Sequence, residues 1–572
     1  MSFASVRKIF LKLIRLAPPL DARIMRLRRK LLAKGGGYPA WSKLVAAEGL
    51  PLQLGAAAAP PRKVLIATSI GSHLPAMQME TTLAAALTLR GAQVEALLCD
   101  ALLPACQMCE PRFFAAPADL AKNGPQGSLC DDCFGPGKRV FGELGIPVHT
   151  YSDNVAPDER AMARRLASEL SIEAIEGFEL DGLKVGEHAK AGALRFYASA
   201  SIGHEPDADA IIRRYFEAAL LTAYAADRLM KREQYDVAVF HHGIYVPQGL
   251  IGEVARRNGV RVVNWNPAYR RNCFLFSHHD TYHHTLMDEP VETWETMSWG
   301  EERRECISSY LRSRWQGDND WIRFTGNPMF EKDRILKEIG CDPDRPIIAC
   351  LTNVMWDAQL HYPANAFRNM LEWLVFTIRY FETRPDLQLV IRVHPAEITG
   401  TVPTRQPVVK VLKEHFDPLP ANVFVVSPES DISTYVLAEM SDSAIIYGTK
   451  TGVELAAVGI PVIVAGEAWI RGKGLTRDAA SPDNYDALLA QLPIGDRMDG
   501  AMIERALKYA HHFFFRRMIP VRCFEQGPGW PPFQFSGTSF AGLMEGVDSG
   551  LDCICSGILS GTPFVYDEPV DA

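Results

Sequence analysis

The chain has 572 residues, of which 47% are hydrophobic and 22% charged, a composition typical of a globular protein rather than a disordered, collagen-like or coiled-coil one. Residues 1–35 contain ten Lys or Arg and one Asp, a net charge of +9, which leaves −17 for the rest of a chain whose net charge is −8. An acidic body disfavours nonspecific nucleic-acid binding, so no nucleic-acid partner is expected. No apolar run reaches the ~18 residues of a spanning helix, and basic residues interrupt any signal-peptide core. We therefore expect a cytoplasmic protein.

The first 60 residues are predicted to form a basic arm and a linker. Over residues 6–17, apolar side chains recur at helical spacing and basic ones fill the other face; Pro18 and Pro19 end the pattern, and residues 23–34 are again basic. Such a helix can lie in the headgroup region of an anionic bilayer. We expect residues 1–35 to bind the inner face of the cell membrane. The alternative is an arm that packs on its own domain with its charges in water.

Short apolar runs that alternate with helical stretches then predict two Rossmann-like halves. In the first half, residues 61–325, the strand candidates are 63–69, 94–99, 236–240 and 260–264. A cysteine-rich insertion is expected at 100–135 and a helical insertion at 155–230. Buried strands alternating with helices indicate a parallel sheet covered on both faces.

Four cysteines of the first insertion have the spacing of metal ligands. Cys106 and Cys109 are separated by two residues, as are Cys130 and Cys133, and twenty residues lie between the pairs. Two such pairs can complete a tetrahedral thiolate site. Zinc is the expected metal, with an iron–sulfur cluster as the less favoured candidate. The alternative is four reduced thiols on an insertion that binds no metal.

Three histidine-containing segments of the first half follow strands. His73 lies in the loop after 63–69, and His242 lies in the His241-His242-Gly243 turn after 236–240. Histidine suits proton transfer because its pKa is near neutrality. Asp280 lies in a third segment, 276–284, which in an extended conformation would place His278, Asp280, Tyr282 and His284 on one face. We regard His73, His242 and Asp280 as the catalytic candidates.

The same alternation restarts in the second half, residues 326–520, with strand candidates at 347–351, 387–393, 422–426, 444–447 and 461–464. Residues 521–572 are assigned to a C-terminal tail. Two Rossmann-like halves with strand-end loops on a central cleft predict the GT-B architecture.

Two strand-end motifs of the second half predict a phosphate site. His394-Pro395 follows one strand, and the loop Gly448-Thr449-Lys450-Thr451-Gly452 joins another strand to a helix. Hydroxyls and backbone N–H groups in such a loop can cradle a phosphate. Glu454, one turn into the helix, is a candidate partner of ribose hydroxyls, and Arg471 a candidate partner of a sugar carboxylate or diphosphate. The alternative is that the threonines and Glu454 only cap the helix.

Residues 345–480, with the motifs RVHPAE and YGTKTGVELAAVGIPVIVAG, resemble the C-terminal half of bacterial capsular polysaccharide biosynthesis glycosyltransferases. That family has the GT-B fold and includes enzymes that use CMP-activated acidic sugars such as Kdo. The resemblance implies that His394, Pro395, Gly448, Thr449 and Thr451 hold the nucleotide phosphate. Ile446 stands where many retaining GT-B enzymes have the first glutamate of a pair, which weakens an assignment to that subgroup.

The sequence therefore predicts a glycosyltransferase that moves a sugar from a CMP- or UDP-linked donor to a bacterial surface polysaccharide or lipid-linked glycan. The second half would bind the nucleotide sugar, the first half would bind the acceptor, and His73 would take the proton from the acceptor hydroxyl. Three alternatives remain at this point: a sugar-nucleotide 2-epimerase, a CDP-polyol phosphotransferase, and a non-catalytic glycan-binding or export module.

Overall fold

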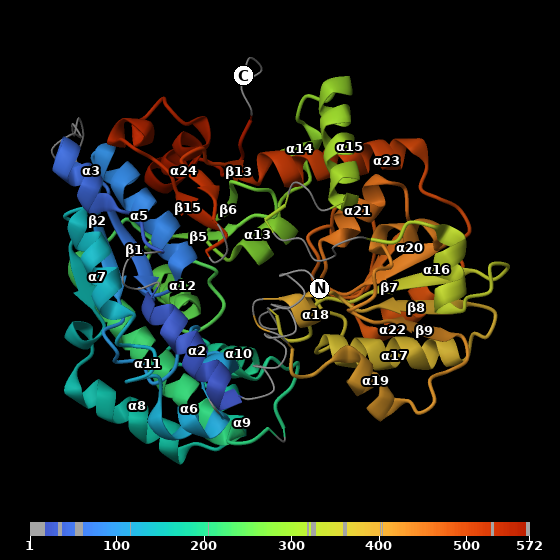
Figure 1. Cartoon of the computed structure of the whole chain (residues 1–572), viewed down its shortest axis with the longest axis horizontal. Helices are drawn as coiled ribbons and strands as arrows, with labels where there is room; N and C mark the ends of the chain where they lie inside the picture. Colours follow the sequence, from blue (N-terminus) through green and yellow to red (C-terminus); the bar gives the residue numbers. More distant parts are fainter. Residues whose placement is uncertain are drawn as a thin grey trace.

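The computed structural model describes residues 18–31, 37–51, 61–114, 116–203, 205–316, 320–321, 328–357, 363–400, 402, 404–527 and 531–567. The amphipathic stretch expected at 6–17 lies outside these residues, as does most of the linker expected before residue 61. Two α/β halves lie side by side, and the C-terminal segment returns to the first half (Figure 1). The expected organisation into two Rossmann-like halves is confirmed.

The first half is built on a seven-stranded sheet in the order β13-β6-β5-β4-β1-β2-β3. Its strands are β1 (Lys63–Ser69), β2 (Gln93–Leu98), β3 (Val148–Thr150), β4 (Val237–His241), β5 (Arg261–Pro267), β6 (Cys273–His278) and β13 (Ile519–Pro520). β1 to β5 are parallel to one another, whereas β6 and β13 are antiparallel to their neighbours. The loops after β1 and β4 therefore emerge at the same edge.

Alternate residues of β1 pack on opposite faces of this sheet. Leu65 and Ala67 belong to one core cluster, with residues of the helical insertion, and Val64 and Ile66 belong to another, with residues of α5 and α24. Because both faces are covered, the strand is apolar along its length, which is why its sequence predicts it so well. The helices of this half are α2 (Pro18–Leu31), α3 (Trp41–Glu48), α5 (Leu74–Leu89), α6 (Pro117–Asn123), α7 (Phe134–Glu143), α12 (Gln248–Arg257) and α24 (Ser549–Ser560).

The expected helical insertion consists of α8 (Pro157–Glu169), α9 (Ile172–Glu176), α10 (Val185–Tyr197) and α11 (Ala208–Glu233). Three further helices, α13 (Tyr282–Met287), α14 (Glu292–Glu295) and α15 (Glu301–Gln316), follow β6 and lead toward the second half. No helix of the described ranges is long and apolar enough to cross a membrane.

The second half is built on a six-stranded, fully parallel sheet in the order β12-β11-β10-β7-β8-β9. Its strands are β7 (Ile347–Leu351), β8 (Gln388–Arg392), β9 (Val423–Val426), β10 (Ser443–Ile446), β11 (Val462–Val464) and β12 (Arg477–Asp478). Its helices are α16 (Lys332–Ile339), α17 (Met370–Glu382), α18 (Ala396–Thr399), α19 (Val408–His415), α20 (Thr434–Met440), α21 (Thr451–Ala457), α22 (Pro482–Leu489) and α23 (Gly500–His511). The position of β7 between β10 and β8 brings the loops after these three strands to one edge.

The C-terminal residues are part of the first half rather than a separate tail. After α23, a π-helical turn at His512–Arg516 leads into β13, which pairs with β6, and α24 packs near α5 and β4. The hairpin of β14 (Phe524–Gln526) and β15 (Phe533–Phe535) lies against α5. The sequence predicts a separate tail from residue 521 and does not predict that the chain returns to the first sheet. The reason is that β13 is only two residues long, too short to show a strand pattern.

Candidate functional site

His394 lies at the carboxyl edge of the second sheet, directly after β8. Its backbone N–H donates to Oγ1 of Thr352, which follows β7, at 3.0 Å, and its Nδ1 accepts from the N–H of Ala396, also at 3.0 Å. Burial, followed by the charge of Lys450, lowers the pKa of His394 to about 4. The ring is therefore neutral at pH 7, with its proton on Nε2, which makes Nε2 a donor.

The loop Gly448–Thr451, which follows β10, lies at the same edge. Asn353, in the loop after β7, lies beside it, because a Cβ added at Gly448 would be 3.8 Å from Asn353 Nδ2. Thr449 Oγ1 lies 3.1 Å from Thr451 Oγ1 and accepts from the N–H of Thr451 at 3.3 Å. The structure thus brings His394, Thr449 and Lys450 to one edge of the sheet. One hydrogen bond of the Thr449 hydroxyl, from the N–H of Thr451, stabilises the start of α21.

Glu454 is held in a buried ion cluster. Its Oε1 accepts from Lys450 Nζ at 2.7 Å, and its Oε2 accepts from Arg314 Nε at 3.0 Å and from the Tyr435 hydroxyl at 2.6 Å. Despite burial, Arg314 and then Lys450 lower the pKa of Glu454 to about 2. These bonds occupy the carboxylate that the sequence assigned to ribose hydroxyls, and they fix Lys450, whose ammonium also lies 4.7 Å from the centre of the Tyr269 ring.

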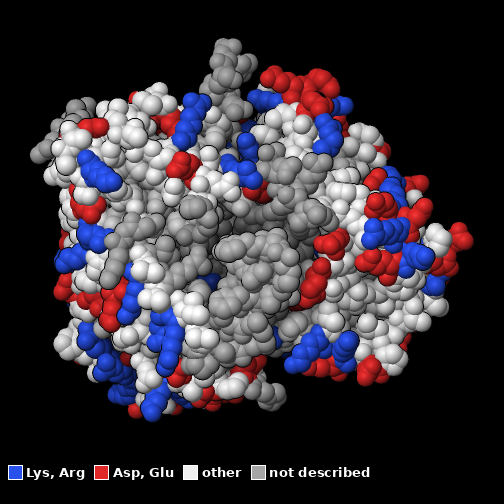
Figure 2. Space-filling view, viewed as in Figure 1, with Lys and Arg blue, Asp and Glu red and all other residues white. Residues whose placement is uncertain are grey.

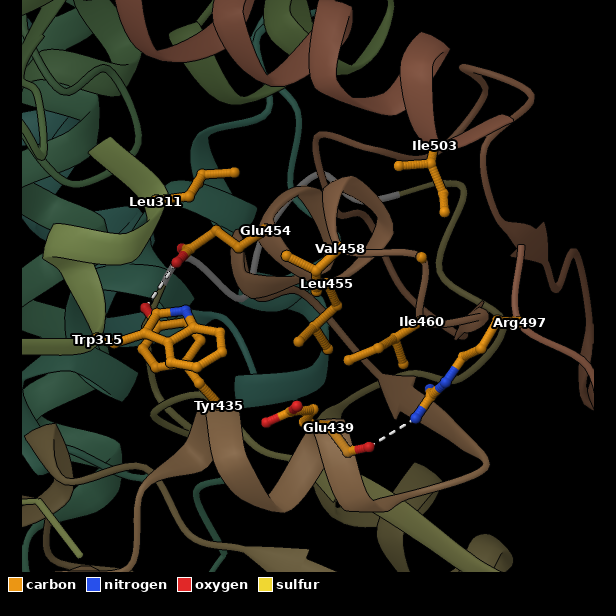
Figure 3. Close-up of a pocket in the computed structure, with 11 residues that line it drawn as sticks. Leu311, Trp315, Tyr435, Glu439, Glu454, Leu455, Val458, Ile460, Arg497 and Ile503 are labelled. Atoms are coloured by element: carbon orange, nitrogen blue, oxygen red, sulfur yellow. Dashed lines mark hydrogen bonds between the residues drawn. The ribbon is translucent and has the colours of Figure 1, made fainter. Parts of the chain in front are cut away.

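Glu454 also lines a cavity of about 380 Å³ behind α21 (Figure 3). Trp315 and Tyr435 stack on its wall with ring centres 5.7 Å apart, while Leu311, Leu455 and Ile460 make it mainly apolar. The residues that line this cavity do not include His394 or Thr449. It is therefore separate from the strand-end edge that carries the two motifs.

In the first half, a row of aromatic rings runs from the loop after β1 toward the second half. The ring centres of His73 and His241 are 4.7 Å apart, those of His241 and His242 5.6 Å, and those of His242 and His283 6.3 Å. The His283 ring stacks on Trp469, which follows β11 in the second half, at 5.5 Å. The predicted candidates His73 and His242 therefore lie in one cluster, together with His241 and His283.

These histidines are neutral at neutral pH. Burial, followed by the nearby Arg195, lowers the pKa of His73 to about 3, and burial also lowers the pKa of His241 and His242 well below the usual value. Beneath them, Glu80 is fully buried, and its Oε1 accepts from Trp265 Nε1 at 2.8 Å. Burial raises the pKa of Glu80 to about 7, despite the hydrogen bond from Trp265.

Arg195 of α10 is the cation beside this cluster. Its guanidinium donates to the Gln107 carbonyl at 2.6 Å and to the Glu110 carboxylate at 3.1 Å, and it lies 5.4 Å from the centre of the Tyr245 ring. The Tyr245 hydroxyl in turn donates to Asp357 of the second half at 3.2 Å. The strand-end loops of the two halves are thus in direct contact.

The prediction that residues 276–284 are extended is wrong beyond His278. β6 ends there and α13 begins at Tyr282, so that the side chains do not share one face. His278 Nε2 lies 2.8 Å from the Thr562 carbonyl oxygen, whereas His284 pairs with Asp280 at 3.1 Å and lies 3.6 Å from Glu467 of the second half. Asp280 also accepts from the N–H of Thr281, so it serves the turn and orients His284.

Two basic residues after β11 have roles within the protein. Arg471 donates to the carbonyl oxygens of Gly466 and Ala479, which stabilises its own loop. Lys473 is almost fully buried and donates to the carbonyl oxygens of Met287 and Glu289, at 2.6 and 2.7 Å, in the first half. Pro395 is the N-cap of the short helix α18.

The four cysteines with ligand spacing lie beside the loop after β1. Each pair forms a tight turn, in which the N–H of Cys109 donates to the Cys106 carbonyl at 2.9 Å and that of Cys133 to the Cys130 carbonyl at 3.0 Å. All four thiols are free. Within the described ranges, no three His, Cys, Asp or Glu side chains are already arranged as ligands of a metal ion.

Sequence reasoning did not identify Arg195, Glu80, Arg314 or Trp469. Arg195 and Arg314 lie on helices far from any strand-end motif, and Glu80 is the one charged residue of α5, which is buried along its length. That acid within an otherwise uncharged helix was the one available signal.

Residues 341–508 match the family described as "Capsule polysaccharide biosynthesis protein". The match covers the second half, with both strand-end motifs, and it confirms the resemblance expected for residues 345–480. None of the proteins with curated functions matches the chain.

Solved structures with related features include KpsC, a beta Kdo 2,4 transferase from Thermosulfurimonas dismutans. It is 14% identical, with a TM-score of 0.32 over 48% of this chain and 80% of that one. UDP-GlcNAc 2-epimerase from Neisseria meningitidis is 10% identical, with a TM-score of 0.23 over 78% of this chain and 98% of that one. MurG from Acinetobacter baumannii is 13% identical, with a TM-score of 0.24 over 79% and 95%. Similarities this weak carry no argument about activity.

Proposed function

We propose that the chain is a glycosyltransferase of capsule polysaccharide biosynthesis, which transfers a sugar from a nucleotide donor to a surface-glycan or lipid-linked acceptor. The observation that carries the proposal is the junction of two strand-end edges. On one side lie His394, Thr449 and Lys450, within the part of the chain that matches the capsule family, and on the other lies the histidine row that begins at His73. A phosphate-binding edge opposite neutral bases fits group transfer from a phosphate leaving group.

On the donor side, His394 Nε2–H and the hydroxyls of Thr449 and Thr451 donate to the phosphate nearest the sugar. Lys450 adds positive charge there, and Glu454 holds Lys450 in place. As the bond between the anomeric carbon and the phosphate oxygen breaks, these groups stabilise the negative charge that develops on the phosphate. A CMP-linked acidic sugar or a UDP-sugar is the donor that we propose.

On the acceptor side, His73 takes the proton of the attacking hydroxyl while that oxygen bonds to the anomeric carbon. A pKa of about 3 makes His73 a weak base in the free protein, because burial and then the charge of the adjacent Arg195 disfavour the protonated ring. A bound donor phosphate offsets the charge of Arg195 and so raises the pKa of His73. Proton transfer is therefore favoured once the donor is bound.

We further propose that α2 holds the protein against an anionic membrane, where lipid-linked acceptors lie. Leu20, Ile24, Leu27 and Leu31 form an exposed stripe along α2, with exposed fractions of 38–64%. Basic side chains gather over and beside this helix on the face shown in Figure 2. An apolar stripe flanked by positive charge suits the interface of an anionic leaflet.

Isothermal titration calorimetry tests the donor site. The wild type and His394→Ala are each titrated with CMP, UDP and CDP. We expect one nucleotide to bind, and His394→Ala to weaken that binding by about tenfold or more because one donor to phosphate is lost. His415→Ala, at an exposed position of α19, is the matched control and should bind as the wild type does.

Three results would contradict the proposal: no nucleotide binds the wild type, both histidine variants bind equally well, or the donor sugar is epimerised at C2 in the absence of any acceptor. A preference for CDP with transfer of a polyol phosphate would assign the same site to a phosphotransferase.

A further inference from the structure

The two cysteine turns are brought together although twenty residues separate them. Gln126, four residues before Cys130, donates to the carbonyl oxygens of Ala101 and Leu103 at 3.0 and 3.1 Å, which ties the segment before the second pair to the segment before the first. The Tyr215 hydroxyl lies 3.3 Å from the Cys106 carbonyl oxygen, so α11 supports the first turn.

The thiols themselves are neighbours. The side chain of Cys106 interacts with that of Cys109, and it interacts electrostatically with both Cys130 and Cys133. Because the four free thiols are not already arranged as ligands, coordination needs rotation of the side chains about their Cα–Cβ bonds, as is usual where metal binding is coupled to local ordering.

A buried cation beside the thiols is the independent observation. Arg29 of α2 is 9% exposed, and one of its guanidinium nitrogens donates to Ser72 Oγ at 2.9 Å and to the carbonyl oxygen of Leu129, next to Cys130. Its Nε and Nη1 have no hydrogen-bond partner among the described residues. A buried guanidinium needs negative charge nearby, and thiolates bound to a metal would provide it.

We propose that Cys106, Cys109, Cys130 and Cys133 bind one zinc ion as four thiolates, with Arg29 as the buried counter-charge. Each thiol releases its proton to solvent on binding, and no electron is transferred. Four thiolates and one divalent zinc have a net charge of −2, and the guanidinium offsets one of these two charges. Tetrahedral coordination by four thiolates is the structural form of zinc binding.

Such an ion would anchor the segment that supports the histidine row. Gln107 and Glu110, in and beside the first turn, hold Arg195, and the N–H of Gln107 donates to the Val246 carbonyl at 2.9 Å, in the loop after β4. The second turn touches the loop that carries His73, since a Cβ added at Gly71 would lie 2.5 Å from the Cys133 carbonyl oxygen. The zinc is thus structural, and its presence does not depend on the proposed transfer reaction.

The experiment measures metal in the full chain, purified without a metal-affinity tag and dialysed against metal-free buffer. Elemental analysis should find about one zinc per chain. Replacement by cobalt should produce the sulfur-to-cobalt charge-transfer absorption of thiolate coordination. Cys106→Ser and Cys130→Ser should each lose the zinc, whereas Cys306→Ser, at a thiol of α15 outside the cluster, should retain it.

The role of Arg29 as counter-charge is tested by measuring the rate at which a chelator removes the zinc. This rate should rise severalfold in Arg29→Met and stay near the wild-type rate in Arg29→Lys. The proposal is overturned if the wild type takes up no zinc when zinc is supplied, if the bound metal is iron with acid-labile sulfide, or if the double variant Cys106→Ser/Cys130→Ser retains one zinc. The first two outcomes depend only on the metal content of the wild type, so the proposal can be overturned even if the double variant does not fold.

Discussion

The junction between the halves collects histidines that are uncharged at neutral pH. Burial, followed by the adjacent His284, lowers the pKa of His283 to about 3, and burial lowers the pKa of His73 and His394 as well. In the unfolded chain the same side chains titrate near 6.5. This difference makes the stability of the protein depend on pH.

We predict that the free energy of unfolding falls as the pH is lowered through 6.5 toward 3. The unfolded chain takes up protons below 6.5, whereas a histidine with a folded-state pKa near 3 does not, so acid favours the unfolded state. His283→Gln removes one such group, and the stability lost between pH 7.5 and 5.5 should shrink by about 1.4 kcal/mol. Urea titrations at the two pH values measure this.

His415→Gln, at an exposed position, is the control for that titration and should lose as much stability as the wild type. Equal pH dependence of His283→Gln and the wild type would show that folding does not lower the pKa of His283.

Glu454 carries a second prediction, because its carboxylate neutralises two buried cations. Glu454→Gln keeps the shape but leaves the charges of Arg314 and Lys450 without their shared partner. We expect a loss of about 3–5 kcal/mol of unfolding free energy, measured by denaturant titration. Glu439→Gln, on an exposed carboxylate that lines the same cavity, should change stability by less than about 1 kcal/mol. A similar small effect in both variants would contradict the assigned role of the cluster.

Some site residues could be predicted from the sequence, and their contacts explain which. The placement of His394 and Thr449 at a sheet edge was predictable because each of them follows a buried strand, and the carboxyl ends of parallel strands lie at one edge of a sheet. Glu454 was placed on the right helix, but its partner Arg314 comes from a helix 140 residues earlier. Nothing in a local pattern reveals such a partner, nor that Asp280 would lie in a turn that starts a helix.

At the scale of elements, the best predictions are strands buried on both faces. The expected ranges 63–69 and 347–351 coincide with β1 and β7, whose residues are almost all buried. β3, β12 and β13 are two or three residues long and partly exposed, so neither apolar content nor alternation marks them. Pro18 and Pro19 open α2, because proline is tolerated in a first turn, whereas the helix that they are predicted to end lies outside the described residues.

The exposed stripe of α2 gives a prediction for this element. Replacing Leu27 and Leu31 by Glu puts charge into the apolar face while leaving the buried Arg29 in place. Co-sedimentation with vesicles that contain anionic lipid should fall at least severalfold, because both the buried apolar area and the charge attraction decrease.

The matched control is the variant Met544→Glu/Val547→Glu, which places the same two charges on an exposed apolar pair near α24. Its vesicle binding should stay close to that of the wild type. If both double variants bind vesicles equally, α2 is not the membrane-binding element.

At the scale of the molecule, the chain crosses between the halves more than once. The helices after β6 lead into the second half, and the segment after α23 returns to pair β13 with β6 (Figure 1). One core cluster contains residues of both halves, among them Leu275 and Leu286 from the first and Val453 and Phe513 from the second part of the chain. Such a core is invisible in sequence, because it depends on how two separately patterned units pack.

Lys473 offers a test of this junction. Its ammonium reaches from the second half to the carbonyl oxygens of Met287 and Glu289, and the side chain is almost completely buried. Lys473→Met leaves both acceptors unsatisfied, so we expect a loss of about 2 kcal/mol of unfolding free energy. Lys508→Met, which removes a more exposed donor to the Glu295 carbonyl, should cost less than about 1 kcal/mol.

The same two variants separate a junction effect from simple loss of stability. If Lys473 fixes the halves relative to each other, Lys473→Met should also increase the radius of gyration measured by small-angle X-ray scattering under native conditions, whereas Lys508→Met should not. Nucleotide binding by the second half should persist in Lys473→Met, because His394 and Thr449 lie on their own sheet, while transfer to an acceptor should fall. Unchanged scattering together with unchanged stability would mean that the aromatic contacts around Trp469 suffice to hold the two edges together.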